Sequence, residues 1–160
     1  MLAIKFHHLR ALIHRPYLSI PLLRDLNDGP VTMSHGERCL VEQYEKTCVS
    51  EAQGTAHLLR NVSNQTELVC DFPWWQMISC LICASSILLV ASIFTRRRGM
   101  SDGEGEVDIL DDDAETCLKV FEALSANSDG ARMARDMMTR LRECGHKWSK
   151  QYYQVCTNIM

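Results

Sequence analysis

The chain has 160 residues, enough for one domain of ordinary size, and its 46% apolar and 23% charged residues are typical of a globular protein. The formal net charge of −3 excludes a global positive field of the kind that attracts nucleic acid. Residues 1–8 lack the uninterrupted apolar centre of a secretory signal. Eight cysteines stand at irregular spacings, which predicts buried, reduced thiols rather than a disulfide framework.

A first helix is expected over residues 2–15. Large apolar residues recur there at helical spacing, at Leu2, Phe6, Leu9 and Ile13. The pattern ends at His14-Arg15-Pro16, because a proline disfavours the helical conformation of the residue before it. His14 has no carboxylate or second histidine at a useful spacing, so we interpret it as a structural residue at a helix end. Residues 16–35 are expected to form a loop, since prolines and an Asp-Gly pair punctuate them.

A second helix is expected over residues 36–62. Its apolar stripe predicts a face that packs in a core and consists of Leu40, Tyr44, Cys48, Ala52, Ala56 and Leu59. The charged residues of this helix lie mostly off the stripe, at Glu42, Glu45, Lys46, Glu51 and Arg60.

The most apolar segment of the chain is opened by Pro73 at a first-turn position, and Met77–Phe94 contains no charged residue. One interpretation is a single membrane span over about residues 74–95. Trp74 and Trp75 would then mark one interface and Arg96–Arg98 the cytoplasmic end. Two glycosylation sequons, at Asn61 and Asn64, lie on the side that would be outside.

The other interpretation is a helix in the core of a soluble all-α domain. Eight of the 18 residues in Met77–Phe94 are Ser, Cys or Ala, which suits close packing against other helices better than lipid. These physical features alone leave both interpretations open.

An acidic segment follows, with eight carboxylates and no basic residue between Gly99 and Glu115. Residues 99–110 are expected to form a solvated loop. Asp111-Asp112-Asp113 is expected to cap the next helix, where negative charge meets the positive end of the helix dipole. A divalent-cation site is the alternative, but adjacent carboxylates at a helix start point in different directions. The apolar face of this helix consists of Ala114, Cys117, Leu118, Phe121 and Leu124.

Residues 125–130 break that helix, and a final helix is expected over 129–144, followed by a tail over 146–160. Its basic residues are expected to form a solvated surface and are Arg132, Arg135, Arg140 and Arg142. Cys80-Leu-Ile-Cys83 has no second pair and lies within an apolar run, so it predicts neither a metal site nor a redox site. With no strand pattern, phosphate loop or nucleophile–base set, the sequence predicts an all-α protein of about five helices, without a sheet and without catalytic activity.

Four short segments, taken in order, carry a family resemblance. They are Leu12-Ile-His-Arg-Pro-Tyr-Leu18; a helix with Cys48, Ala52 and Ala56; Pro73-Trp74-Trp75; and Ala114-Glu-Thr-Cys-Leu-Lys-Val-Phe-Glu-Ala-Leu-Ser125 with Ser128 and an Ala/Arg helix behind it. In this order they resemble the C-terminal half of the fungal-specific transcription factor domain. This domain is the regulatory middle homology region of fungal zinc-cluster transcription factors. The resemblance covers roughly residues 5–145.

The resemblance implies a soluble, nuclear, all-α regulatory domain over residues 1–145, in which the Pro-Trp-Trp helix packs inside. The positions that match the family's structural core are His14, Arg15, Pro16, Pro73, Trp74, Trp75, Cys117, Leu118 and Leu124. The family's zinc cluster and the front half of its regulatory domain have no counterpart here. The resemblance therefore implies no zinc and no DNA contact in this chain, with DNA reached only through a missing domain. It implies protein partners or self-association, and a small-molecule effector. A small single-pass membrane protein remains the alternative.

Overall fold

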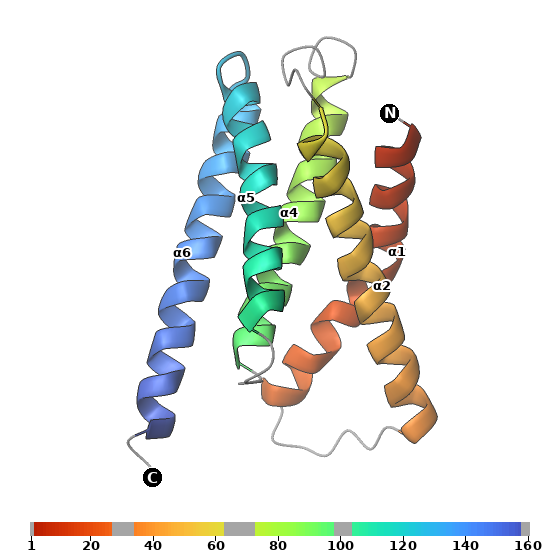
Figure 1. The fold of residues 1–160 in the computed structure, drawn as a ribbon, viewed down its shortest axis with the longest axis vertical. Coiled ribbons are helices and arrows are strands. Elements are labelled where there is room, and N and C mark those ends of the chain that lie inside the picture. Colours follow the sequence, from red (N-terminus) through yellow and green to blue (C-terminus); the bar gives the residue numbers. More distant parts are fainter. Residues whose placement is uncertain (1, 27–33, 63–72, 98–103, 158–160) are drawn as a thin grey trace.

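The computed structural model describes residues 2–26, 34–62, 73–97 and 104–157, which form five helices and no strand. The helices are α1 (Leu2–Leu26), α2 (His35–Arg60), α4 (Trp74–Arg97), α5 (Glu104–Ser125) and α6 (Asp129–Thr157). Successive helices run in opposite directions, with α4 between the α1–α2 pair and the α5–α6 pair (Figure 1). The all-α prediction of about five helices without a sheet is confirmed.

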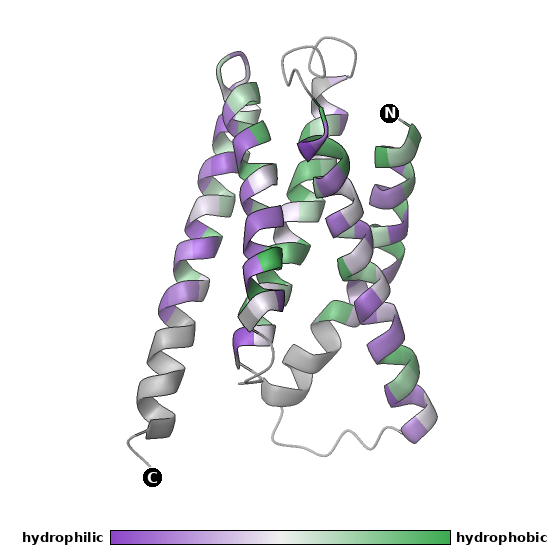
Figure 2. Cartoon of the chain, viewed as in Figure 1, coloured by the Kyte–Doolittle hydropathy of each residue, from purple (hydrophilic) through white to green (hydrophobic). Residues whose placement is uncertain are grey.

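The central helix α4 contacts all four other helices. Met77, Leu81, Ile87 and Leu88 are at most 1% exposed. A helix that is apolar on every side is stable in water only when it is covered on every side, and the four neighbours provide that cover. Figure 2 shows green along most of α4, whereas the outer sides of α2, α5 and α6 carry purple. The predicted core helix is therefore the hub of this bundle.

The predicted end of the first helix at Pro16 is wrong, because α1 continues to Leu26 through both Pro16 and Pro21. Figure 1 shows that α1 bends partway along its length, as helices do where a proline removes a backbone hydrogen bond. The Cys48 thiol of α2 donates to the Ala11 carbonyl at 3.6 Å, in the turn before Pro16. Packing against α2 and α4 offsets the local cost of the proline, so the chain bends instead of ending the helix.

The second helix matches its prediction to within two residues and begins with a cap that the periodicity does not reveal. The Glu37 backbone N–H donates to Ser34 Oγ at 3.3 Å, and the Ser34 backbone N–H donates to Glu37 Oε2 at 2.8 Å. This reciprocal pair is a capping box, and its Ser-x-x-Glu spacing is legible in the sequence. The hydrogen bonds from Ser34 lower the pKa of the Glu37 carboxyl.

Two predictions for the C-terminal third are wrong. Residues 104–110 belong to α5, so Asp111–Asp113 lie inside that helix and do not cap it; residues 99–103 of the predicted loop lie outside the described residues. The last helix also runs past residue 144 to Thr157, through most of the predicted tail. The break at residues 125–130 is confirmed, because α6 begins where Ser128 Oγ accepts the backbone N–H of Ala131 at 3.3 Å.

Candidate functional site

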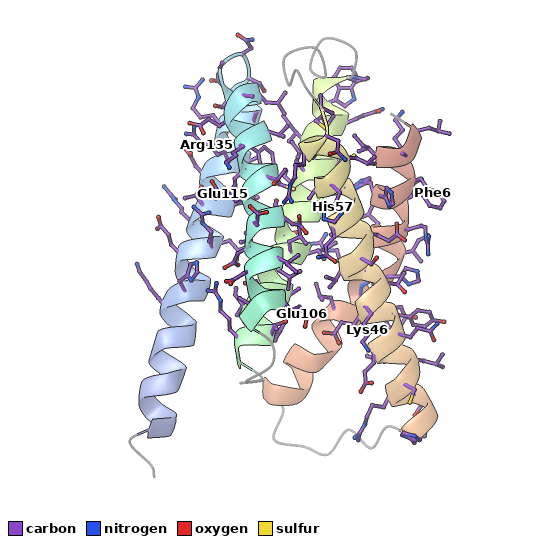
Figure 3. The ribbon with its side chains drawn as sticks, in the orientation of Figure 1. Phe6, Lys46, His57, Glu106, Glu115 and Arg135 are labelled. Atoms are coloured by element: carbon purple, nitrogen blue, oxygen red, sulfur yellow. The ribbon has the colours of Figure 1, made fainter. Side chains whose placement is uncertain are left out.

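The three adjacent aspartates of α5 form ion pairs with two neighbouring helices: Asp112 and Asp113 with Arg60 of α2, and Asp111 with Arg96 of α4. Asp113 is fully buried and accepts from Arg60 Nη2 at 2.9 Å and Gln53 Nε2 at 3.2 Å, both on α2. The same Arg60 guanidinium donates to the exposed Asp112 at 2.7 Å. His57 adds a nitrogen 3.3 Å from Asp113, and Figure 3 shows His57 on the side of α2 that faces α5. These contacts join α2 to α5.

Asp111 points toward α4. It accepts from Ser92 Oγ at 2.6 Å and pairs with the Arg96 guanidinium. The three carboxylates therefore diverge and are neutralised by side chains of α2 and α4. Among the described residues, no group of three His, Cys, Asp or Glu side chains is arranged to hold a metal ion. The aspartates form ion pairs between helices and not a cation site.

A second buried carboxylate lies at the α1–α2 contact. Glu51, which the stripe analysis placed off the core face, is only 7% exposed. Its side chain lies 2.6 Å from His7 Nδ1 and 2.9 Å from Arg10 Nη1, both on α1. Gly54, one turn later, allows the His7 ring to approach so closely that an added Cβ would lie 2.8 Å from it. These polar contacts fix how α1 lies on α2.

The described cysteines are free thiols. Burial raises the pKa of Cys48 and Cys117 to about 12 and that of Cys80 to about 11, and it also raises the pKa of Cys83. Neutral buried thiols are poor nucleophiles and poor metal ligands. The four buried cysteines are small core residues, as predicted, whereas Cys39 and Cys144 are exposed. Cys70 and Cys156 lie outside the described residues or side chains.

The family-like residues occupy different environments. His14 is half-buried within α1 and its ring stacks on that of Tyr44 of α2, with centroids 5.2 Å apart. The Tyr17 ring lies against the same Tyr44 ring, with centroids 4.6 Å apart. Arg15 and Pro16 are exposed. Pro73 precedes α4, and its carbonyl accepts the first backbone N–H groups of that helix. Trp75 is 57% exposed, and the Trp74 side chain lies outside the described part.

The family-like residues of α5 are all in the core. Cys117, Leu118 and Leu124 are at most 6% exposed. The arginines of α6 are in part paired: Arg142 contacts Glu115 across the α5–α6 contact, and Arg132 contacts Asp129 within α6. Figure 3 places Glu115 and Arg135 on this side of the bundle.

The outer side of α1 carries an unusual set of exposed apolar side chains. Their exposed fractions run from 40% to 86%, and they are Leu2, Phe6, Leu9, Leu12 and Ile13. We call these five residues the α1 ridge. The inward side of the same helix buries Ile4, Ala11 and Leu18 instead. Figure 3 shows Phe6 projecting away from the bundle. The spacing that predicts this helix therefore describes its solvent face, because four of the five ridge residues follow that spacing and the fifth, Leu12, adjoins it.

A pocket of about 240 Å³ lies between α1 and the first turns of α4 and adjoins the α1 ridge through Leu9. Its lining comprises Lys5, His8, Leu9, Trp75, Gln76, Ser79 and Cys80. We call it the α1–α4 pocket. Its walls are mostly apolar.

Two of the residues that line this pocket each contain a buried polar atom without a hydrogen-bond partner. His8 Nδ1 and Gln76 Oε1 are buried at the atomic level, and neither is paired. Burial lowers the pKa of His8, so the ring is neutral near pH 7 and its Nδ1 acts as an acceptor when Nε2 carries the proton. Buried polar atoms are nearly always satisfied in folded proteins, so these two atoms distinguish this part of the α1–α4 contact. The α1 ridge and the α1–α4 pocket together form the candidate binding site.

Sequence reasoning did not find this site, because its residues come from two helices separated by some sixty positions. The one local signal is that apolar and basic residues alternate through α1 while no acidic residue appears before Asp25.

No protein-family model matches this chain, and neither a curated protein nor a solved structure does.

Proposed function

We propose that the chain is a non-catalytic, transcription-regulatory helical module of the fungal zinc-cluster type, acting in the nucleus. The order of the four family-like segments carries the proposal. In the bundle these segments lie on α1, α2, α4 and α5, four helices that pack around one core. The proposed role is to receive a regulatory contact and pass it to a DNA-bound transcription complex.

The candidate site supports a binding role rather than a chemical one. Its described side chains offer mostly apolar surface, while the buried thiol of Cys80 has its pKa raised to about 11 and is unsuited to nucleophilic attack. The carboxylates of Glu51, Asp111 and Asp113 are each held by basic or hydroxyl partners from neighbouring helices. Such pairing suits a rigid scaffold that presents a surface.

A reporter assay tests this function. Residues 1–160 are fused to a heterologous DNA-binding domain and expressed in a fungal host. We expect the fusion to raise or lower transcription relative to the DNA-binding domain alone. A core variant, Leu88→Asp, is expected to abolish the change, whereas Met133→Ser on the exposed side of α6 is expected to preserve it. A fusion that accumulates in the nucleus at the same level and leaves transcription unchanged contradicts the proposal.

A second candidate function rests on one observation. The segment Trp75–Arg96 of α4 is long and apolar enough to cross a membrane, although 67% of its most apolar window is buried inside the bundle. In a single-pass protein that segment would lie in lipid and could not bury its surface against α1, α2, α5 and α6 at once. Carbonate extraction distinguishes the two candidates, because only a protein that spans a membrane stays in the carbonate-resistant pellet.

A further inference from the structure

We propose that the contact between α1 and the first turns of α4 is a pH-sensitive switch, in which protonation of His8 loosens the part of α1 before Pro16 from α4 while α1 stays on α2. Loosening opens the α1–α4 pocket and exposes the Cys80 thiol in its lining. Three observations carry the inference: the unpaired ring nitrogen of His8, the lack of a described carboxylate in the pocket lining, and the opposite surroundings of His7. The inference does not depend on the regulatory function, because it concerns a contact within the fold.

His8, which lines the α1–α4 pocket, has a buried ring nitrogen without a hydrogen-bond partner. This atom is Nδ1, and no described group accepts from it or donates to it. A neutral imidazole can leave that nitrogen bare and keep its proton on Nε2, whereas an imidazolium has an N–H group at both nitrogens. Protonation therefore adds a positive charge and buries a donor without an acceptor. Both effects cost free energy in the closed contact and are relieved when the ring meets water.

The described lining of the pocket supplies no negative charge to His8. It contains two other titratable groups, the Lys5 ammonium of α1 and the Cys80 thiol of α4. Lys5 is a cation, and burial raises the pKa of Cys80 to about 11, so this thiol is neutral between pH 5 and 8. In addition, α1 contains no acidic residue before Asp25. An imidazolium at position 8 therefore shares the pocket with a like charge and with no described carboxylate.

His7, the preceding residue, faces α2 and has the opposite surroundings. Its Nδ1 lies 2.6 Å from Glu51, and the same carboxylate lies 2.9 Å from Arg10 Nη1. An Nδ1–H group on His7 can donate to this carboxylate whether the ring is neutral or protonated. The contact of α1 with α2 is therefore compatible with acid, and the contact with α4 is the one that a proton on His8 opposes.

Acidification is the direction that opens the α1–α4 contact. Burial lowers the pKa of His8 from its ordinary value of 6.5. The contribution of the neutral ring is therefore complete above about pH 6.5 and is lost as the pH falls below that value, because the open form takes up the proton first. Pro16 interrupts the backbone hydrogen bonding of α1, so residues 2–15 can move with less disturbance of the rest of the helix.

Thiol labelling of the full chain measures the opening. Dithiodipyridine reacts with thiols by disulfide exchange, and mass spectrometry of the digested chain follows each cysteine. Cys80 is 3% exposed and Cys144 is exposed on α6, so dividing the labelling rate of Cys80 by that of Cys144 removes the effect of pH on the reaction itself. We expect this ratio to rise about three- to tenfold from pH 7.5 to pH 5.5, since one proton contributes at most about tenfold per pH unit. The ratio of Cys117 to Cys144 is expected to stay constant, because Cys117 lies in the core away from the pocket.

Matched variants assign the change to His8. His8→Gln has a polar side chain that does not titrate, and it is expected to keep the Cys80 ratio the same at both pH values. His35→Gln, the same change at an exposed histidine of α2, is expected to keep the rise of the parent. Ser79→Asp adds a carboxylate to the pocket lining and is expected to reduce the rise to less than about twofold, because it stabilises the imidazolium in the closed contact. Ser79 is exposed, so this variant tests the proposal even if His8→Gln does not fold.

Three results would overturn the proposal. The first is a Cys80 ratio that is unchanged between pH 7.5 and pH 5.5. The second is a rise that persists in full in His8→Gln or, where that variant does not fold, in Ser79→Asp. The third is an equal rise for Cys117, which would show that acid unfolds the whole bundle and not the α1–α4 contact.

Discussion

Asp113 is fully buried, whereas the side chain of its neighbour Asp112 is 66% exposed. Both carboxylates contact the same Arg60 guanidinium, so they differ in environment far more than in partner. An exposed ion pair contributes little to stability, because water screens the attraction. A buried pair behaves differently: when either side is removed, the other is left desolvated and unpaired, which lowers stability. The two positions therefore form a natural matched pair.

We expect Asp113→Ala to lower the free energy of unfolding by about 1–3 kcal/mol, because it leaves Gln53 without its acceptor and removes the buried acceptor of Arg60 at the α2–α5 contact. Asp112→Ala is expected to cost less than about 1 kcal/mol. Urea denaturation measures both. Equal losses at the two positions would contradict the assignment of Asp113 as a buried structural carboxylate.

The buried thiol of Cys117 makes stability depend on pH in a defined direction. Burial raises its folded pKa from 9.0 to about 12, and the unfolded chain has the ordinary value. Its contribution is therefore complete below about pH 9 and is lost as the pH rises toward 12, because only the unfolded thiol ionises in that window. We expect a loss of about 1.4 kcal/mol per pH unit above pH 9 from this group.

The measurement compares urea unfolding at pH 8, 9 and 10 for the parent chain, Cys117→Ala and Cys39→Ala. The Cys117→Ala variant is expected to be less stable at pH 8 but to lose less stability on alkalisation. Cys39 is exposed, so its variant should keep the parent's slope. The same slope in all three proteins would show that Cys117 is not protected in the fold.

At the scale of the element, α2 shows how one helix uses glycine in two ways. Gly36 lies in the first turn with nothing near its missing side chain, whereas Gly54 receives the His7 ring of α1. Alanine generally favours a helix over glycine by roughly 0.5–1 kcal/mol. That gain is available only where a methyl group fits.

We expect Gly36→Ala to raise the free energy of unfolding by up to about 1 kcal/mol. Gly54→Ala is expected to lower it, since the new methyl group displaces His7 and disturbs the 2.6 Å contact between His7 and Glu51. Thermal melting ranks the two variants against the parent. A stabilising Gly54→Ala would mean that α1 does not approach α2 at this point.

The hub role of α4 is tested by placing a charge at its centre. Leu88 is 0% exposed, so Leu88→Asp buries a carboxylate without a partner and removes a large side chain. The combined cost of several kcal/mol is comparable to the ~5–15 kcal/mol stability of a small domain. We expect helical content to fall across the whole chain, including α5 and α6.

Ser79→Asp is the matched control for this change. Ser79 is exposed on the same helix, and its variant should retain the circular dichroism and the melting curve of the parent. If Leu88→Asp melts like Ser79→Asp, α4 is not buried in the bundle.

The sequence predicts most of the fold but not the surface of α1. Periodicity located α2, and the uncharged run located α4, because long patterns of one period have few alternative structures. The prediction that the first helix ends at Pro16 was wrong. The preference of the residue before a proline for a non-helical conformation is weaker than the packing of both halves of α1 on the bundle. The prediction that Asp111–Asp113 cap a helix was also wrong, because nothing in the local sequence indicates that α2 and α4 supply cations to the middle of α5.

The candidate site was beyond sequence reasoning for a different physical reason. An apolar stripe on a helix predicts that one side is buried, but α1 is apolar on two sides. Ile4 and Leu18 face the core and Phe6 and Ile13 face solvent. Which side turns inward is decided by the neighbours, and the α1–α4 pocket exists only once both helices are in place.

At the scale of the whole molecule, the bundle and a membrane span predict different compartments. If α4 is covered by its four neighbours, the protein should fractionate with soluble or nuclear material and carry no glycan at Asn61 or Asn64. Asn61 forms the C-cap of α2, and Asn64 lies outside the described residues. Carbonate extraction and glycosidase treatment measure both properties. A carbonate-resistant pellet with a glycosidase-sensitive mass shift would instead support the membrane candidate.

The central position of α4 also has a consequence during synthesis. Two of its neighbours precede it in the chain and two follow it. A ribosome that has released α1, α2 and α4 has therefore produced an apolar helix with cover on one flank only, since α5 and α6 are not yet made. Exposed apolar surface of this kind invites aggregation and attracts chaperones. Translation that pauses between residues 97 and 129 should lower the soluble yield of this protein more than a pause before residue 73, when the hub helix does not yet exist.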